Sequence, residues 1–204
     1  MKPLWIDTPT QLAEACAQWQ TRDWISVDTE FVRINTYRAQ LCLVQIGDGS
    51  LNACIDPLAI DDLTPMWALM ANAGILKVLH ASGQDFELVV EHTGRTPAPV
   101  FDTQIAATLI GLGDQLGYAG LVEKRLGLPV DKSLSRTDWA RRPLTQPEID
   151  YAADDVRHLS ALYPALRDEV AARGRLPWLL EDCERLTEPT RYQVLPENAW
   201  TRLK

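Results

Sequence analysis

The chain has 204 residues, 46% of them hydrophobic and 24% charged, which is the composition of a globular protein with a sizeable core. Its formal net charge is −8. This excludes a protein that holds nucleic acid by overall positive charge, so a polyanionic substrate would need local basic groups or metal ions. The four cysteines form no CxxC pair, and we expect reduced thiols in a cytoplasmic protein with no membrane-spanning segment.

The first half of the chain has the pattern of an antiparallel meander. A short edge strand is expected at 4–6, and a helix follows from Pro9 to about Trp19 because Thr8 and Gln11 have capping-box spacing. Residues 25–31 read as a buried strand. Two further apolar runs, 39–46 and 51–55, are joined by a Gly-Asp-Gly-Ser turn, which is typical of a hairpin.

From residue 57 onward, strands and helices alternate. Helical spacing is found at 63–70, 83–94, 102–112 and 118–126, with short strands between at 75–79 and 100–101. After a basic loop at 127–143, a second capping box at Thr145 and Glu148 opens a long helix to about Arg173, and a shorter helical pattern covers 176–186. The predicted fold class is therefore α/β, with a mixed sheet (antiparallel meander plus parallel strands) flanked by helices on both faces.

Two acidic residues interrupt the buried strand at 25–31. Asp28 and Glu30 are two apart, so a strand directs both carboxylates to one face, about 7 Å apart at the backbone. Like charges on a buried face are unfavourable without a counter-charge, and a divalent cation with oxygen ligands would supply one. The alternative is a strand end with two solvated acids.

Three later residues belong to the same hypothesis. Asp85 falls in the first turn of the helix after the fourth strand, at the sheet edge where α/β proteins bind ligands. Tyr151 and Asp155 are four apart and share one face of the long helix. The alternatives are that Asp85 only caps its helix, that Tyr151 is a core residue, and that Asp155 is solvated.

Taken together, these residues resemble the DEDD superfamily of 3′–5′ exonucleases in order, spacing and structural context. The variant is the tyrosine one (DEDDy), because Asp150 stands where the histidine variant carries its histidine. Longer motifs at 27–33 (VDTEFVR), 80–85 (HASGQD), 101–104 (FDTQ) and 131–139 (DKSLSRTDW) look like bacterial ribonuclease D, and the likeness covers nearly the whole chain.

The resemblance implies a ribonuclease H-like fold and an exoribonuclease that releases nucleoside 5′-monophosphates from RNA 3′ ends. Its partners would be tRNA precursors and other small structured RNAs, with no membrane and no obligate protein partner indicated. Asp28, Glu30, Asp85 and Asp155 would hold two divalent ions, Mg²⁺ or Mn²⁺. Tyr151 would orient the attacking water rather than remove its proton, because an unperturbed tyrosine pKa is near 10.

Substrate contacts are expected from the basic loop and from two aromatic residues. The candidates for gripping the backbone are Lys132, Arg136, Arg141 and Arg142, and the candidates for stacking on bases are Phe31 and Trp139. The alternatives are solvated arginines and a tryptophan that packs in the core.

The domain organisation and two rival functions complete the set of expectations. Residues 1–175 would form the exonuclease domain, and 176–204 an extension toward the helical RNA-binding domains that follow it in ribonuclease D. The rival functions are a 3′–5′ exodeoxyribonuclease of the same superfamily and a non-catalytic RNA-binding module.

Overall fold

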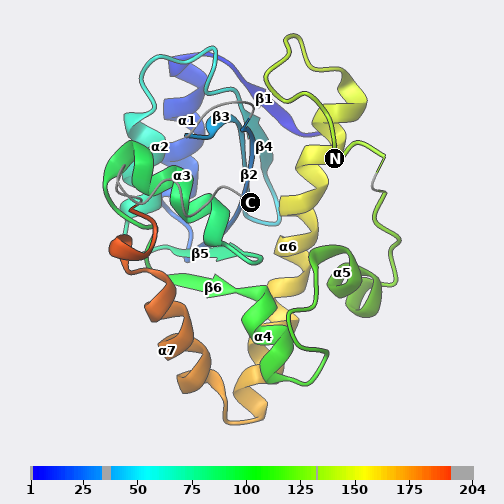
Figure 1. Cartoon of the computed structure of the whole chain (residues 1–204). Coiled ribbons are helices and arrows are strands. Elements are labelled where there is room, and N and C mark those ends of the chain that lie inside the picture. The colour runs from blue at the N-terminus through cyan, green and yellow to red at the C-terminus, as the bar shows by residue number, and fades with distance from the viewer. Residues whose placement is uncertain (1, 34–37, 132, 194–204) are drawn as a thin grey trace.

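In the computed structural model, which describes residues 2–33, 38–131 and 133–193, six strands form a mixed sheet in the order β1-β4-β3-β2-β5-β6 (Figure 1). The strands are β1 (Leu4–Ile6), β2 (Trp24–Val32), β3 (Gln40–Gly47), β4 (Asn52–Ile55), β5 (Leu76–Leu79) and β6 (Val100–Asp102). β2, β3 and β4 are antiparallel, whereas β5 and β6 follow β2 in parallel and β1 is parallel to β4. The predicted meander followed by parallel strands is confirmed.

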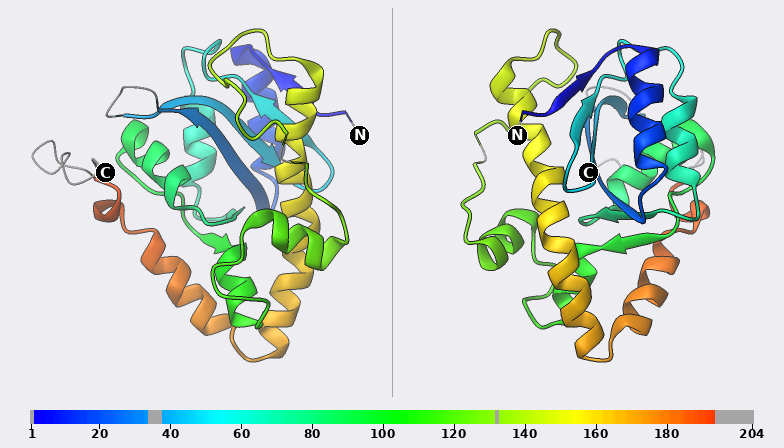
Figure 2. Two further views of the ribbon diagram at one scale, coloured as in Figure 1. Left: turned by 45° about the vertical axis from the view of Figure 1, so that its right-hand side comes forward. Right: turned by 180° about the vertical axis from the view of Figure 1, so that it is seen from behind.

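Helices cover both faces of this sheet (Figures 1 and 2). The helices on one face are α1 (Pro9–Trp19), α2 (Thr64–Ala71) and α3 (Gly83–Thr93). The helices on the other face are α4 (Thr103–Leu109), α5 (Tyr118–Leu126), α6 (Gln146–Ala172) and α7 (Leu176–Leu186). A 3₁₀ turn at Pro189–Arg191 follows α7. α7 packs against β6 and α4, and it buries Leu179 and Cys183. In the described part of the chain, no helix combines the length and the apolar character that crossing a bilayer requires.

Both predicted capping boxes form. The Thr8 and Thr145 side chains each accept the backbone N–H of the third helical residue, while Gln11 and Glu148 bond back to the backbone N–H of the cap residue. The helix predicted at 102–112 ends earlier, at Leu109. Gly111 has a φ of +80°, a left-handed conformation in which the chain leaves the helix.

A close approach between α6 and the sheet fixes the position of the helix. The Ser26 hydroxyl on β2 lies 2.9 Å from the carbonyl oxygen of Val156 and 2.8 Å from the hydroxyl of Ser160. Gly47 on β3 leaves room for these contacts, since a Cβ there would sit 2.9 Å from the Ser26 Oγ. The residue before Val156 is thereby held above the face of β2 that carries the acidic pair.

The start of α3 is fixed by a single buried carboxylate. Asp102, at the end of β6, caps α4 by accepting the backbone N–H of Gln104 at 2.8 Å. Its other oxygen accepts the Ser82 N–H at 3.0 Å, from the residue just before α3. Asp102 therefore caps α4, and the same carboxylate sets where α3 begins relative to β6.

Candidate active site

Three carboxylates from distant parts of the sequence converge on one face of β2. Asp28 and Glu30 project from β2, and Asp155 comes from the middle of α6. Each offers a ligand oxygen, and these oxygens all lie within 4.8 Å of one another. The structure thus brings together three of the four predicted metal ligands in a spacing that suits a single divalent cation.

Asp85 approaches this group from the first turn of α3 but stands slightly apart from it. Its Oδ1 accepts a 2.5 Å hydrogen bond from the hydroxyl of Thr29, the residue between the two acids of β2. Asp85 is still close enough to repel the charges of Asp28 and Glu30. The fourth predicted ligand therefore lies beside the other three, and Thr29, which the sequence patterns did not single out, orients it.

Burial and mutual repulsion make these carboxyl groups hard to ionise. Burial raises the pKa of Glu30 to about 8, and the charges of Asp155 and Asp85 add to the rise. The pKa of Asp28 is raised well above its ordinary value for the same reasons. Burial raises the pKa of Asp155 to about 7 although a hydrogen bond from Tyr118 opposes it, and that of Asp85 to about 6. A divalent cation would offset the repulsion between these carboxylates, so the donor set and its electrostatics fit a metal site.

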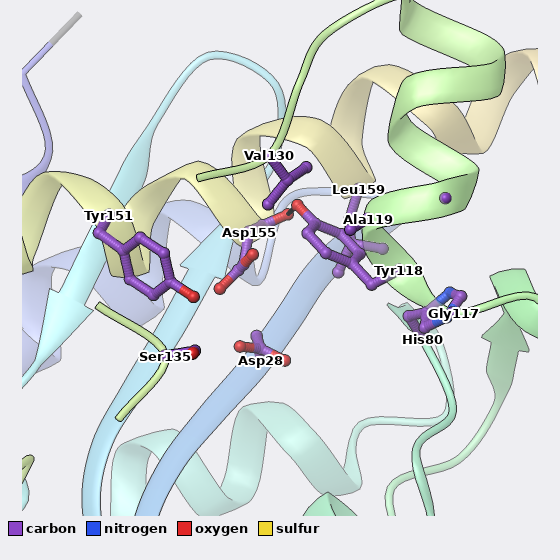
Figure 3. Close-up of a pocket in the computed structure, with 11 residues that line it drawn as sticks. Asp28, His80, Gly117, Tyr118, Ala119, Val130, Ser135, Tyr151, Asp155 and Leu159 are labelled. Atoms are coloured by element: carbon purple, nitrogen blue, oxygen red, sulfur yellow. Dashed lines mark hydrogen bonds between the residues drawn. The ribbon is translucent and has the colours of Figure 1, made fainter. Parts of the chain in front are cut away.

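Tyr151 stands at the edge of the carboxylate group, one helical turn before Asp155. Figure 3 shows its hydroxyl directed toward the carboxylates of Asp155 and Asp28. Its ring stacks on that of Trp139, with centroids 6.3 Å apart and planes 23° apart. Burial, followed by the nearby carboxylates, raises the pKa of its phenol to about 12. The phenol is therefore neutral near pH 7 and suited to donating or accepting a hydrogen bond.

A cavity of about 570 Å³ opens beside these groups (Figure 3). Besides Asp28, Tyr151 and Asp155, it is lined by His80 and Ser135, which belong to two of the quoted motifs. The other lining residues lie outside those motifs: Gly117, Tyr118, Ala119, Gly120, Val130 and Leu159. The hydroxyl of Tyr118 lies 3.2 Å from the main-chain oxygen of Asp155 and 3.0 Å from Nδ1 of His158. Tyr118 sits at the start of an ordinary amphipathic helix, so only the packing of α5 on α6 reveals it.

The predicted substrate-binding residues differ in their exposure and in their contacts. Phe31 is half-buried and packs against the hydrophobic core, while Arg136 is exposed. Lys132 lies outside the described residues. Arg141 pairs with Glu148 at 2.7 Å, within the capping box of α6.

Two of these residues occupy positions unlike those predicted. Only 3% of Trp139 is exposed, so its ring has little surface for stacking on a base. The guanidinium of Arg142 bonds both oxygens of the buried Asp56 carboxylate, each at 2.7 Å. Such a paired group is engaged inside the protein rather than available to a phosphate, because the buried Asp56 needs a counter-charge.

Comparisons with known proteins agree with this arrangement. A family model described as 3′–5′ exonuclease matches residues 3–171. The chain is 47% identical to ribonuclease D of Zymomonas mobilis over 204 residues, covering 99% of this chain and 52% of that protein. It therefore spans about half the length of the ribonuclease D relatives it matches.

Solved structures give the same result for the fold. The crystal structure of Escherichia coli RNase D, described as an exoribonuclease involved in structured RNA processing, superimposes with a TM-score of 0.92 at 41% identity, covering 99% of this chain and 54% of that one. Brucella melitensis NrnC with bound Mg²⁺ superimposes with a TM-score of 0.78 at 25% identity, covering 99% and 96%. The predicted ribonuclease H-like fold and the resemblance to ribonuclease D are confirmed, and the chain belongs to the 3′–5′ exonuclease family.

Proposed function

We propose that this chain is a metal-dependent 3′–5′ exoribonuclease that removes nucleoside 5′-monophosphates one at a time from RNA 3′ ends. The observation that carries the proposal is the convergence of Asp28, Glu30 and Asp155 beside Tyr151 at the mouth of a cavity. The substrates we propose are the 3′ ends of tRNA precursors and other small structured RNAs. The catalytic domain would comprise residues 1–175, which the family match at 3–171 nearly spans.

In this proposal, Asp28, Glu30 and Asp155 would hold one divalent ion, and Asp85 would help to hold a second. The ions are Mg²⁺ or Mn²⁺; the Mg²⁺ bound to the related NrnC supports the first of these. Such ions supply a nucleophilic hydroxide at neutral pH and stabilise negative charge on the leaving oxygen and phosphate. A pair of ions also reconciles the net charge of −8 with a polyanionic substrate.

Tyr151 orients the attacking water in this scheme. Its pKa of about 12 leaves the phenol protonated at neutral pH, so it positions the water by a hydrogen bond and is unsuited to act as a general base. Tyr118 lines the same cavity, and its hydroxyl contacts the main chain of Asp155.

A cytoplasmic location is part of the proposal. The four cysteines, Cys16, Cys42, Cys54 and Cys183, are buried and unpaired, which suits a compartment that keeps thiols reduced.

The test uses 5′-labelled RNA and a matched DNA strand with Mn²⁺, followed over time on a sequencing gel. The expected result is an RNA ladder that shortens by single nucleotides, no shortening with EDTA, and slower digestion of DNA. Asp155→Asn should abolish the ladder, while Asp168→Asn, an exposed site on the same helix, should leave it unchanged. Faster digestion of DNA would favour the exodeoxyribonuclease, and intact RNA with retained binding would favour a non-catalytic module.

A further inference from the structure

We propose that Trp139 and Arg142 are positioning residues that hold the Tyr151 phenol in its orientation toward the carboxylates, an inference that rests on the function proposed above. The mechanical link runs from Asp56 through Arg142 and Trp139 to Tyr151. These residues come from three separate segments: the turn directly after β4, the loop before α6, and α6 itself.

The anchor of this link is the Arg142 guanidinium. Its Nε and Nη2 bond the two oxygens of Asp56, each at 2.7 Å, and Asp56 is only 3% exposed. Nη2 also donates to the carbonyl of Cys42 on β3 at 2.6 Å, and Nη1 donates to the carbonyl of Trp139 at 2.7 Å. The planar guanidinium thus hydrogen-bonds the loop to β3 and to the turn after β4. Lysine cannot reproduce this geometry.

The second part of the link is the Trp139 ring. With its carbonyl held by Arg142, the buried side chain packs among residues of β3, β4 and α6 (Cys42, Leu43, Cys54, Ala152 and Ala153). The indole ring then lies nearly parallel to the ring of Tyr151, with centroids 6.3 Å apart and planes 23° apart. A ring enclosed in this way has little freedom, so it presents a fixed surface to the phenol.

Tyr151 needs such a surface because it is only partly buried and borders the cavity. Its phenol is raised on two rotatable bonds above a helix whose neighbouring residues, Ala152 and Ala153, are small. A misplacement of about 1 Å near the reacting atoms costs about 10²-fold in rate. Removing the indole face would therefore let the hydroxyl sample unproductive orientations without disturbing Asp28, Glu30 or Asp155.

The test is a double-mutant cycle of Trp139→Leu with Tyr151→Phe, measured as kcat and KM on 3′-labelled RNA with saturating Mn²⁺. Trp139→Leu should lower kcat about 10-fold, leaving KM and the Mn²⁺ concentration for half-maximal activity within about twofold. In the Tyr151→Phe background the same change should lower kcat by less than twofold, because the hydroxyl it positions is already gone. Trp139→Phe should recover most of the activity, and Trp178→Leu, at a ring 57% exposed on α7, should have no effect.

Several results would overturn the inference while leaving the exonuclease assignment intact. They are full additivity of the two substitutions, a Trp139→Leu defect larger than that of Tyr151→Phe, or a rise in KM with unchanged kcat, which would indicate base stacking. If Trp139→Leu does not fold, Arg142→Lys tests the same inference. It must lower kcat in the wild-type background and have little effect on kcat in the Tyr151→Phe background. An inactive wild-type chain would instead contradict the proposed function itself.

Discussion

The crowding of carboxylates on one face of β2 should lower the stability of the metal-free protein, and substitution of Glu30 measures this effect. Its folded-state pKa of about 8 compares with an ordinary value of 4.5. At about 1.4 kcal/mol for each pKa unit, the ionised side chain opposes folding by at most about 5 kcal/mol in the metal-free protein. The cost is smaller than this maximum, because a proton can bind to a neighbouring carboxylate instead of Glu30. We therefore expect Glu30→Gln to raise the free energy of unfolding by about 2 to 4 kcal/mol at pH 8.

The sign of the pH dependence follows from proton linkage. The folded state binds the Glu30 proton more tightly than the unfolded chain does, so stability is lost as the pH rises from about 4.5 through about 8. Glu30→Gln should therefore stabilise the protein by less than about 1 kcal/mol at pH 5 and by about 2 to 4 kcal/mol at pH 8.

Urea unfolding followed by circular dichroism, with EDTA present, measures both values. Glu14→Gln, at an exposed position on α1, is the matched control and should show no pH-dependent difference. Mn²⁺ at pH 8 should stabilise the wild type more than the Glu30→Gln variant. An equal effect of Glu30→Gln at both pH values, or destabilisation at pH 8, would refute the reasoning.

Three further predictions address the catalytic tyrosine, the packing of α6 and the buried lysine of β5. Tyr151→Phe should lower kcat about 10²-fold yet leave Mn²⁺ affinity unchanged by calorimetry, and loss of metal binding would contradict a positioning role. Gly47→Ala should lower the free energy of unfolding by about 1 to 3 kcal/mol, because the new Cβ would meet the Ser26 Oγ at 2.9 Å; Gly83→Ala, with nothing within 4 Å, should be neutral, and equal effects would argue against the close approach. Burial lowers the pKa of Lys77 to about 8, so the wild type should gain stability relative to Lys77→Met as the pH rises from about 8 to 10.5. Parallel pH profiles of these two proteins would show that Lys77 titrates normally.

The strand and helix pattern could be predicted because it depends on local rules. Alternation along β2 directs Asp28 and Glu30 to one face, and this holds wherever the strand lies in the sheet. The capping boxes at Thr8 and Thr145 set two helix starts for equally local reasons. Asp85 and Asp155 could be added to the candidate site only because the order and spacing of all the acids match a known superfamily.

The rest could not be predicted because it depends on which distant segments meet. Arg142 and Asp56 are 86 residues apart, and nothing local distinguishes an arginine that binds phosphate from one that neutralises a buried aspartate. Trp139 could equally stack on a base or pack in a core. Tyr118 reaches the main chain of Asp155 only through the packing of α5 against α6, which no spacing in the sequence encodes.

The release of nucleoside 5′-monophosphate from 3′-labelled RNA by wild type and Asp28→Asn tests the central claim most directly. Asp28 is the half-buried carboxylate whose pKa is raised by burial and by the charges of Asp155, Asp85 and Glu30 together. With Mn²⁺, the wild type should release labelled mononucleotide from the first time point. Asp28→Asn should release none, although its metal-free melting temperature is expected to equal or exceed that of the wild type. Mononucleotide release by Asp28→Asn at the wild-type rate, or short oligonucleotides as the first product of the wild type, would contradict the account.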